Sequence, residues 1–313
     1  MKKLYTQLLD KKSGAKAGAG HAASRNEPAD LSSRKQVEKS AASRPVPVRP
    51  VRADTRALFE YMESRQLAGQ AAKPVGPAYS RNRIDKNLIT VLRRDSFETE
   101  MFKVLRGKIT HPVDGEAPKS ILITSAVSGE GKSFVAANLA VTIAEFINEH
   151  VLLMDCDLRD PCIHKRFGFP QVFGLNEYLK DGRPLSSLLL KTMVKKLSIL
   201  PGGRPPHNPS EILASPKMTD LIGELKSRYA DRRLIIDAPP PNVAPETIAL
   251  SKQVDAILVV VRHQHTPVSL VREALDSFQK GKILGLVINR FDGGLSRHYG
   301  YGRYKQYKKY YRQ

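Results

Sequence analysis

Short apolar runs alternate with longer amphipathic stretches through much of the chain. The apolar runs are Ser120–Thr124, Val151–Met154, Leu197–Leu200, Leu234–Ile236, Ala256–Val261 and Leu284–Ile288. Continuous hydrophobicity over so few residues is typical of strands that are covered on both faces. We expect helices over Lys132–Ile147, over Ser210–Tyr229, with Ser210 as N-cap and Pro216 as an interruption, and over about Pro267–Gln279. The alternation predicts an α/β fold, a mostly parallel sheet with helices on both faces.

A further helix is expected ahead of the first strand. Apolar residues recur at helical spacing between Phe97 and Ile109. Asp95 and Ser96 are both suitable N-caps, and the helix should end before the His111-Pro112 pair. The ordered domain is therefore expected to begin near Ser96.

The two ends of the chain have a different composition from this central part. Residues 1–80 carry 15 Lys/Arg against 7 Asp/Glu and few large apolar side chains. Such a stretch cannot bury enough apolar surface to offset its conformational entropy. We therefore expect a basic, mostly disordered extension over 1–95, a nucleotide-binding domain over 96–292 and a flexible tail over 293–313.

The overall charge and the cysteine content limit which partners and which cellular compartment the chain suits. The formal net charge is +20 over 313 residues, which suggests a polyanionic partner such as nucleic acid, anionic lipid or a nucleotide. The two cysteines, Cys156 and Cys162, match no common metal spacing and suit a reducing compartment. The longest apolar run, Ala256–Val261, is far shorter than the ~20 residues needed to span a bilayer. We expect a soluble protein in a cytosolic setting, which another molecule would have to hold if it works at a membrane.

A phosphate-binding motif lies between the first strand and the helix that follows it. Residues 126–133 read AVSGEGKS, which fits the P-loop with Ala at its first small position. Small residues let backbone N–H groups face phosphates, and the helix N-terminus adds a favourable dipole. Lys132 would reach the β and γ phosphates of ATP, and the Ser133 hydroxyl would bind Mg²⁺. Nucleotide contacts are predicted for Ser128, Gly129, Glu130, Gly131, Lys132, Ser133 and Phe134.

Three aspartates follow two other buried strands. Asp155 and Asp157 come after one strand, and Asp237 comes after another. Ligands bind at the carboxyl edge of open α/β sheets, where charged side chains are costly unless they meet a metal or a partner. Ser133, Asp155 and Asp237 are the expected Mg²⁺ ligands, directly or through water. Any one aspartate could be an ordinary surface residue, but three beside a P-loop indicate catalysis.

The three motifs together resemble a known family. GEGKS (129–133), LLMDCDLRDP (152–161) and LIIDAPP (234–240) are similar to the bacterial tyrosine kinases of exopolysaccharide and capsule production. These kinases share a P-loop class with the partition and septum-site ATPases. The resemblance covers roughly two-thirds of the chain, from about Ser96 to the end. It implies a P-loop kinase that uses ATP and Mg²⁺, in which Asn289 reads the adenine.

The resemblance also assigns roles within the site. Lys132, Asp155, Asp157 and Asp237 are the implied catalytic residues. A tyrosine hydroxyl has a pKa near 10 and needs help to lose its proton. Asp157 is the candidate for this help, and Asp155 is its substitute.

A tyrosine cluster ends the chain, as it does in this family. Six of the 11 tyrosines lie within the last 15 residues, interleaved with Lys and Arg. The expected phosphoacceptors, most plausibly phosphorylated by a neighbouring subunit, are Tyr299, Tyr301, Tyr304, Tyr307, Tyr310 and Tyr311. Alternative functions of such a tail are binding of nucleic acid by stacking, binding of anionic lipid, or none.

A non-kinase ATPase switch of the partition or septum type is the alternative to a kinase. Partition-type ATPases carry a second lysine early in the P-loop, where this chain has Val127 and Ser128. The missing lysine and the tyrosine tail both favour the kinase.

The family resemblance further implies partners. The family's ring-forming motif Glu-x-x-Arg-x-x-Arg reads here Glu100, Lys103 and Arg106, with one Arg replaced by Lys. The resemblance therefore implies a homo-oligomer, with a ring as one form that it can take. The other expected partners are a separate membrane-bound protein that controls polysaccharide chain length and a phosphotyrosine phosphatase. They place the kinase peripherally at the inner face of the cell membrane, and no specific nucleic acid is expected.

Overall fold

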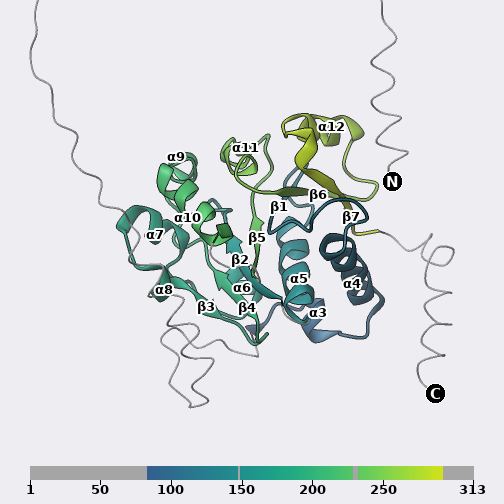
Figure 1. Ribbon diagram of the computed structural model, residues 1–313, viewed down its shortest axis with the longest axis horizontal. Helices are drawn as coiled ribbons and strands as arrows, with labels where there is room; N and C mark the ends of the chain where they lie inside the picture. Colours follow the sequence, from purple (N-terminus) through teal and green to yellow (C-terminus); the bar gives the residue numbers. More distant parts are fainter. Residues whose placement is uncertain (1–82, 147–148, 228–231, 292–313) are drawn as a thin grey trace, which may run out of the picture. The chain divides into compact units, whose positions relative to one another are not determined.

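The computed structural model describes residues 83–146, 149–227 and 232–291, and a seven-stranded sheet forms its centre (Figure 1). The strands are β1 (Ser120–Ser125), β2 (His150–Asp155), β3 (Leu190–Lys191), β4 (Leu197–Leu200), β5 (Arg232–Asp237), β6 (Ala256–Arg262) and β7 (Ile283–Asn289). Their order is β3-β4-β2-β5-β1-β6-β7, and every pair is parallel except β3–β4. The six predicted strands are all present, and the predicted α/β fold class is confirmed.

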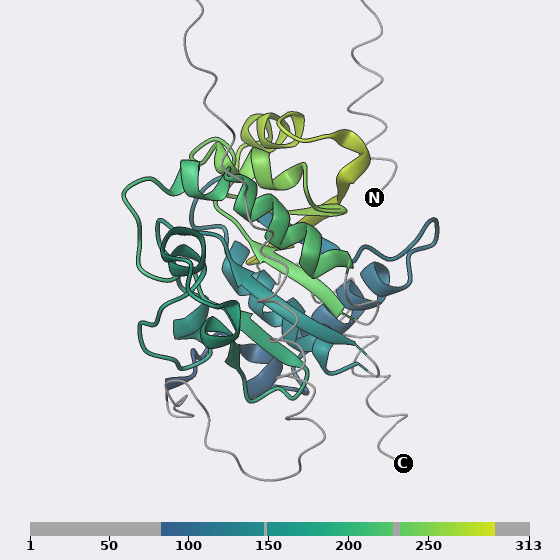
Figure 2. The same ribbon diagram turned by 60° about the vertical axis from the view of Figure 1, so that its left-hand side comes forward.

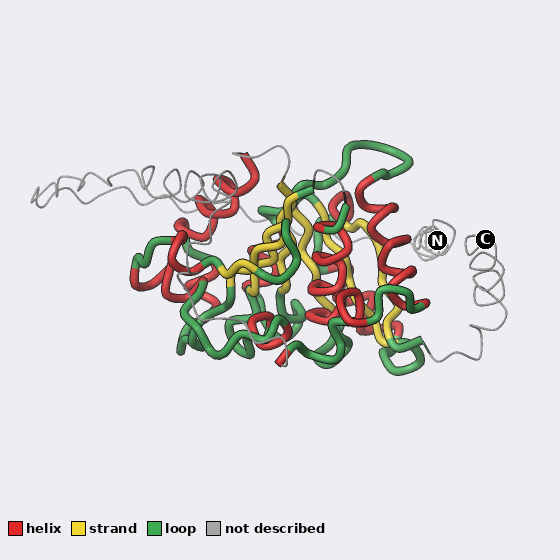
Figure 3. The backbone as a smooth tube through the Cα atoms, turned by 90° about the horizontal axis from the view of Figure 1, so that it is seen from below, coloured by secondary structure: helices red, strands yellow, loops and turns green. Residues whose placement is uncertain are grey.

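Helices cover both faces of the sheet (Figures 2 and 3). They are α3 (Ile89–Leu92), α4 (Phe97–Thr110), α5 (Lys132–Ala144), α6 (Ile163–Arg166), α7 (Leu175–Asp181), α8 (Leu185–Leu188), α9 (Pro209–Leu213), α10 (Pro216–Ser227), α11 (Glu246–Ser251), α12 (Val268–Asp276) and the 3₁₀ turn η2 (Lys280–Lys282). The first four pack into one apolar cluster with the sheet, and α7 to α12 pack into the cluster on the opposite face. The two clusters show why the strands are apolar on both sides.

The pleat of β2 and β5 decides where their last residues point. Leu153 and Ile235 belong to the cluster that contains α5, whereas Leu152 belongs to the opposite cluster. Alternate side chains of a strand share a face, so Asp155 and Asp237 follow Leu153 and Ile235. The two aspartates are also direct register partners across β2 and β5. The fold therefore brings both carboxylates to one edge of the sheet, on the face that α5 covers.

Two predicted helices differ from expectation in their details. Ser96, rather than Asp95, caps α4, because its Oγ accepts a hydrogen bond from the Thr99 N–H at 3.2 Å. The helical stretch predicted from 210 is interrupted at Pro216 as expected, and this residue begins a second helix. Asn208 occupies the N-cap position of α9, so the prediction of Ser210 as the cap is wrong. The Ser210 hydroxyl has another partner, described below.

The packed part of the chain begins earlier than the predicted boundary at residue 96. Leu88 and Ile89 are 1% and 3% exposed and belong to the α5 cluster. The N–H and hydroxyl of Thr90 both donate to Asn138 Oδ1, at 3.1 and 2.9 Å. The remainder of the predicted extension and the predicted tail lie outside the described residues. Within those residues, no helix is both long enough and apolar enough to cross a membrane.

Candidate active site

The P-loop turns from β1 into α5 through two glycines in the left-handed region. Gly129 has φ 82° and Gly131 has φ 96°, conformations that other residues adopt only with strain. A Cβ atom on Gly131 would also lie 2.2 Å from Nδ2 of Asn289. The backbone conformation therefore favours glycine at 131, a side chain there would displace Asn289, and the loop delivers its amides to the start of α5.

Glu130 braces this loop from inside the protein. Its side chain is buried, and Oε2 accepts a hydrogen bond from the Val127 N–H at 2.9 Å. Oε1 accepts from the Arg262 N–H at 3.2 Å and from the Thr266 hydroxyl. These bonds tie the P-loop to the end of β6. Any contact of Glu130 with nucleotide must therefore come from its backbone, because its carboxylate is already engaged.

Two other predicted nucleotide contacts lie beside the loop. Asn289, at the end of β7, donates from Nδ2 to the carbonyl of Glu130 at 2.7 Å. Its proximity fits the expected position, and recognition of adenine stays a prediction. The ring of Phe134 packs edge to face on Phe102, with centroids 5.7 Å apart. That ring faces α4, so only the backbone of Phe134 is placed for a phosphate.

Lys132 is held by Asp157. Its Nζ lies 2.7 Å from Asp157 Oδ2 and donates to the Ser133 hydroxyl at 3.3 Å. Burial alone would lower the pKa of Lys132, but the carboxylates of Asp237 and Asp157 outweigh burial and raise it. The lysine is therefore a permanent cation, and it neutralises Asp157.

Asp155 organises the loop that follows β2. Its Oδ1 accepts from the Asp157 N–H at 3.2 Å, and its Oδ2 accepts from the N–H groups of Cys162 and Ile163, both at 2.9 Å. Burial, followed by the charge of Asp237, raises the pKa of Asp155 to about 8. A direct bond to a metal would compete with three N–H donors. The geometry therefore favours Asp155 as a positioning group for Asp157.

Asp237 differs from Asp155 in that no described group donates to it at hydrogen-bond distance, although the Ser133 hydroxyl lies nearby. Both carboxylate oxygens are buried without a hydrogen-bond partner among the described residues. Burial raises the pKa of Asp237, and the charge of nearby Lys132 opposes this rise. Such a carboxylate is costly unless a cation binds it.

The donor set suits Mg²⁺ bound together with a nucleotide. No group of three or more His, Cys, Asp or Glu side chains in the described part of the chain is arranged to hold a metal. Mg²⁺ in nucleotide sites needs only one or two protein ligands, because phosphates and water supply the rest. Asp237, whose two oxygens have no hydrogen-bond partner among the described residues, and Ser133, in the first turn of α5, fit that requirement.

A network that the motifs did not reveal borders the site. The side chain of Glu246 is 1% exposed and accepts hydrogen bonds from Arg159 Nε at 3.1 Å and from the Ser210 hydroxyl at 2.9 Å. Arg159 also donates to the Ser210 oxygen at 3.2 Å. The network joins the loop after β2 to α9 and α11, which follow β4 and β5. Glu246 belongs to no motif in the sequence, so only the fold identifies it.

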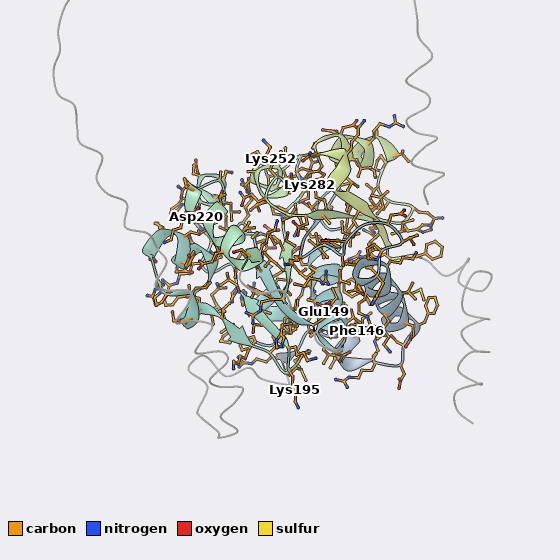
Figure 4. The ribbon with its side chains drawn as sticks, viewed as in Figure 1. Phe146, Glu149, Lys195, Asp220, Lys252 and Lys282 are labelled. Atoms are coloured by element: carbon orange, nitrogen blue, oxygen red, sulfur yellow. The ribbon has the colours of Figure 1, made fainter. Side chains whose placement is uncertain are left out.

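The predicted oligomerisation residues on α4 have partners within this chain. Lys103 Nζ lies 2.8 Å from Glu100 Oε1. Arg106 donates to the carbonyl of Thr142 at 3.1 Å and lies over the ring of Phe146, which Figure 4 labels near the end of α5. Arg106 is therefore turned towards α5, and its role between subunits stays a prediction. The six predicted phosphoacceptor tyrosines lie outside the described residues.

Comparison with known proteins identifies the family. A ParA model, described as an NUBPL iron-transfer P-loop NTPase, matches residues 116–292. The tyrosine-protein kinase YwqD of Bacillus subtilis is 32% identical over 225 residues, which cover 71% of this chain and 93% of YwqD. EpsB of Ralstonia solanacearum is 31% identical over 217 residues, so the match covers 68% of this chain but only 28% of EpsB.

A solved structure agrees with these relationships. The crystal structure of the chimerical protein CapA2B2 is 30% identical, with a TM-score of 0.61. The match covers 74% of this chain and 98% of that protein. The chain therefore belongs to the bacterial tyrosine-kinase family, within the ParA-type P-loop NTPases.

Proposed function

We propose that this chain is an ATP-dependent protein-tyrosine kinase that phosphorylates the tyrosine cluster of its own tail, between copies. The observation that carries the proposal is the Lys132–Asp157 contact beside the unpartnered Asp237. It places a phosphate-binding cation, a candidate base and a candidate metal ligand together in a member of a kinase family. The proposed acceptors are Tyr299, Tyr301, Tyr304, Tyr307, Tyr310 and Tyr311.

The P-loop would hold the donor. Its amides and Lys132 would bind the β and γ phosphates of ATP, with Asn289 beside the loop for adenine. Ser133 and Asp237 would hold Mg²⁺, which neutralises phosphate charge when bound. Asp155 would keep the following loop in place through its three N–H bonds.

Nucleotide binding would release the base. Without nucleotide, Lys132 neutralises Asp157 at 2.7 Å. Phosphates would compete for Lys132 and leave the Asp157 carboxylate free to accept a proton. The tyrosine hydroxyl would pass its proton to Asp157, and its oxygen would bond to the γ-phosphorus as the bond to the β–γ bridging oxygen breaks. The products are phosphotyrosine and ADP.

The charge of the tail would limit the reaction. The basic side chains of Arg303, Lys305, Lys308, Lys309 and Arg312 would be attracted to an acidic, phosphate-filled site. Each phosphotyrosine adds about −1.5 to −2 charge, so several would make the tail anionic. The carboxylates would then repel it, and the copies would separate. An oligomer of the same size before and after phosphorylation would contradict this step.

The wider setting follows from the family resemblance. We propose that the kinase regulates exopolysaccharide or capsule synthesis or export, that a separate membrane-bound chain-length protein activates it, and that a phosphatase reverses it. These contacts would hold the kinase at the inner face of the membrane.

The function is tested by incubating the full chain with Mg²⁺-ATP and measuring phosphotyrosine and released phosphate. Phosphotyrosine is expected in the native chain and not in Lys132→Met. Phosphate release without phosphotyrosine would instead favour the partition-type switch, whose family model matches this chain. If neither phosphotyrosine nor free phosphate forms when the purified activator is present, both activities are excluded.

A further inference from the structure

A pocket lies at the edge of the sheet that is opposite to the P-loop. Its volume is about 230 Å³, and its lining includes residues at the starts of β2, β4 and β5. The P-loop follows the end of β1, which runs parallel to β5, so the two sites occupy opposite ends of the strands. Figure 4 labels Lys195, a lining residue, at the lower end of the view.

The lining of this pocket is strongly cationic. It contains Lys191, Lys195, Lys196 and Arg232, and no Asp or Glu is among the described residues that line it. Neighbouring like charges repel one another, and a concave, partly apolar wall strengthens their field. An anion bound in the pocket would relieve the repulsion.

Two of these lysines are available to a ligand. Lys196 donates to the carbonyl of Phe146 at 3.2 Å, which fixes its position. Lys191 and Lys195 are exposed, and neither side chain has an ion pair or a hydrogen bond with another described residue. The hydroxyl of Ser198, which is the register partner of Lys191, is likewise without a hydrogen bond in the described chain. Two cations and one hydroxyl donor therefore meet in one concave site.

We propose that this pocket binds a diphosphate group through Lys191, Lys195 and Ser198. Lysine binds phosphate as a point charge, and two separate lysines suit two phosphate groups. Pockets for drug-sized ligands measure roughly 300–1,000 Å³, so this smaller one suits the diphosphate rather than a whole nucleotide. The diphosphate can belong to a soluble ester or to a lipid headgroup.

Titration with inorganic pyrophosphate tests the site directly. The full chain is used in a Lys132→Ala background, so that the P-loop contributes little. Lys191→Ser/Lys195→Ser should weaken binding by about tenfold or more, because both lysine charges proposed to bind the diphosphate are lost. The matched control Lys252→Ser/Lys280→Ser removes two exposed lysines outside the pocket and should change the affinity less than about twofold.

A third variant and a stability measurement distinguish lost binding from lost folding. Ser198→Ala should weaken binding by a smaller factor. All variants should have the same melting temperature as the native chain. Equal weakening in both lysine pairs, or no saturable binding, would overturn the proposal.

Vesicles distinguish the two sources of the diphosphate. Sedimentation is compared between vesicles that contain a lipid with a diphosphate headgroup and vesicles of neutral lipid alone. If Lys191→Ser/Lys195→Ser weakens binding of both pyrophosphate and the diphosphate-lipid vesicles, the pocket takes the headgroup. If only pyrophosphate binding weakens, the ligand is a soluble ester. A loss of vesicle binding in a protein that never bound pyrophosphate would indicate diffuse surface charge and contradict the proposed site.

Discussion

The carboxyl edge of the sheet carries an excess of buried negative charge, whereas the amino edge carries an excess of exposed positive charge. At the carboxyl edge, Asp155, Asp157 and Asp237 surround one cation, Lys132, and all four side chains are largely buried. At the amino edge, lysines line a pocket without a carboxylate among its described residues, and two of them are exposed. Buried charge cannot be screened by salt, whereas exposed charge can. The carboxyl edge therefore requires a specific cation and phosphates. The exposed lysines at the amino edge remain solvated without an anion, so leaving the pocket empty costs little free energy.

The largest expected effect comes from Asp157→Asn at the carboxyl edge. Loss of the proton acceptor should lower the rate of tyrosine phosphorylation by about 10²-fold or more. ATP affinity should stay the same or rise, because nucleotide binding no longer has to break the ion pair between Lys132 and the residue 157 carboxylate. Asp160→Asn, at an exposed carboxylate three residues on, is the matched control. A loss below about tenfold would remove Asp157 from its proposed role.

Asp237→Asn sharpens the contrast through stability. The substitution removes a buried negative charge whose two oxygens have no donors among the described residues. In EDTA the variant should be about 2 kcal/mol more stable than the native chain in urea unfolding. With Mg²⁺ and nucleotide this advantage should disappear, because the native carboxylate then has its cation. A less stable variant in EDTA would show that Asp237 is already compensated.

Gly131→Ala should weaken nucleotide binding by about tenfold. The new Cβ would meet Asn289 Nδ2 at 2.2 Å, and φ 96° is strained for alanine by about 1–2 kcal/mol. Gly107→Ala on α4 is the control, because a Cβ there meets nothing within 4 Å. Fluorescence titration with a labelled nucleotide measures both. Equal affinities would mean that the loop can rearrange freely.

The smallest effect per unit of change is the pH dependence of the metal-free fold, which accumulates over several pH units. The pKa of Asp155 is about 8 in the folded chain and about 3.9 when unfolded. Between these values the folded state binds more protons, so stability should fall as pH rises, by about 1 kcal/mol per pH unit. The contribution is complete below about pH 4 and lost above about pH 8. Unfolding in EDTA measures it, and a stability that rises across this window would contradict the assigned shift.

The sequence predicted those features that depend on local pattern. Continuous apolar runs identified the six main strands, and the P-loop motif marked the turn between the first strand and the helix that follows it. The short helices between 163 and 188 were not predicted, because four to seven residues are too few for a periodic signal. The inward orientations of Glu130 and Phe134 depend on β6 and α4, which are distant in the sequence. Glu246 is recognisable only through its contacts with Arg159 and Ser210.

The central claim, transfer of phosphate from ATP to the tail of another copy, has a direct test. A chain with all six tail tyrosines changed to Phe is mixed with a Lys132→Met chain and Mg²⁺-ATP, and phosphorylated peptides are located by mass spectrometry. The proposed mechanism predicts phosphotyrosine on the Lys132→Met tail, although that chain cannot phosphorylate itself. ATP hydrolysis in the mixture without phosphate on that tail would contradict it.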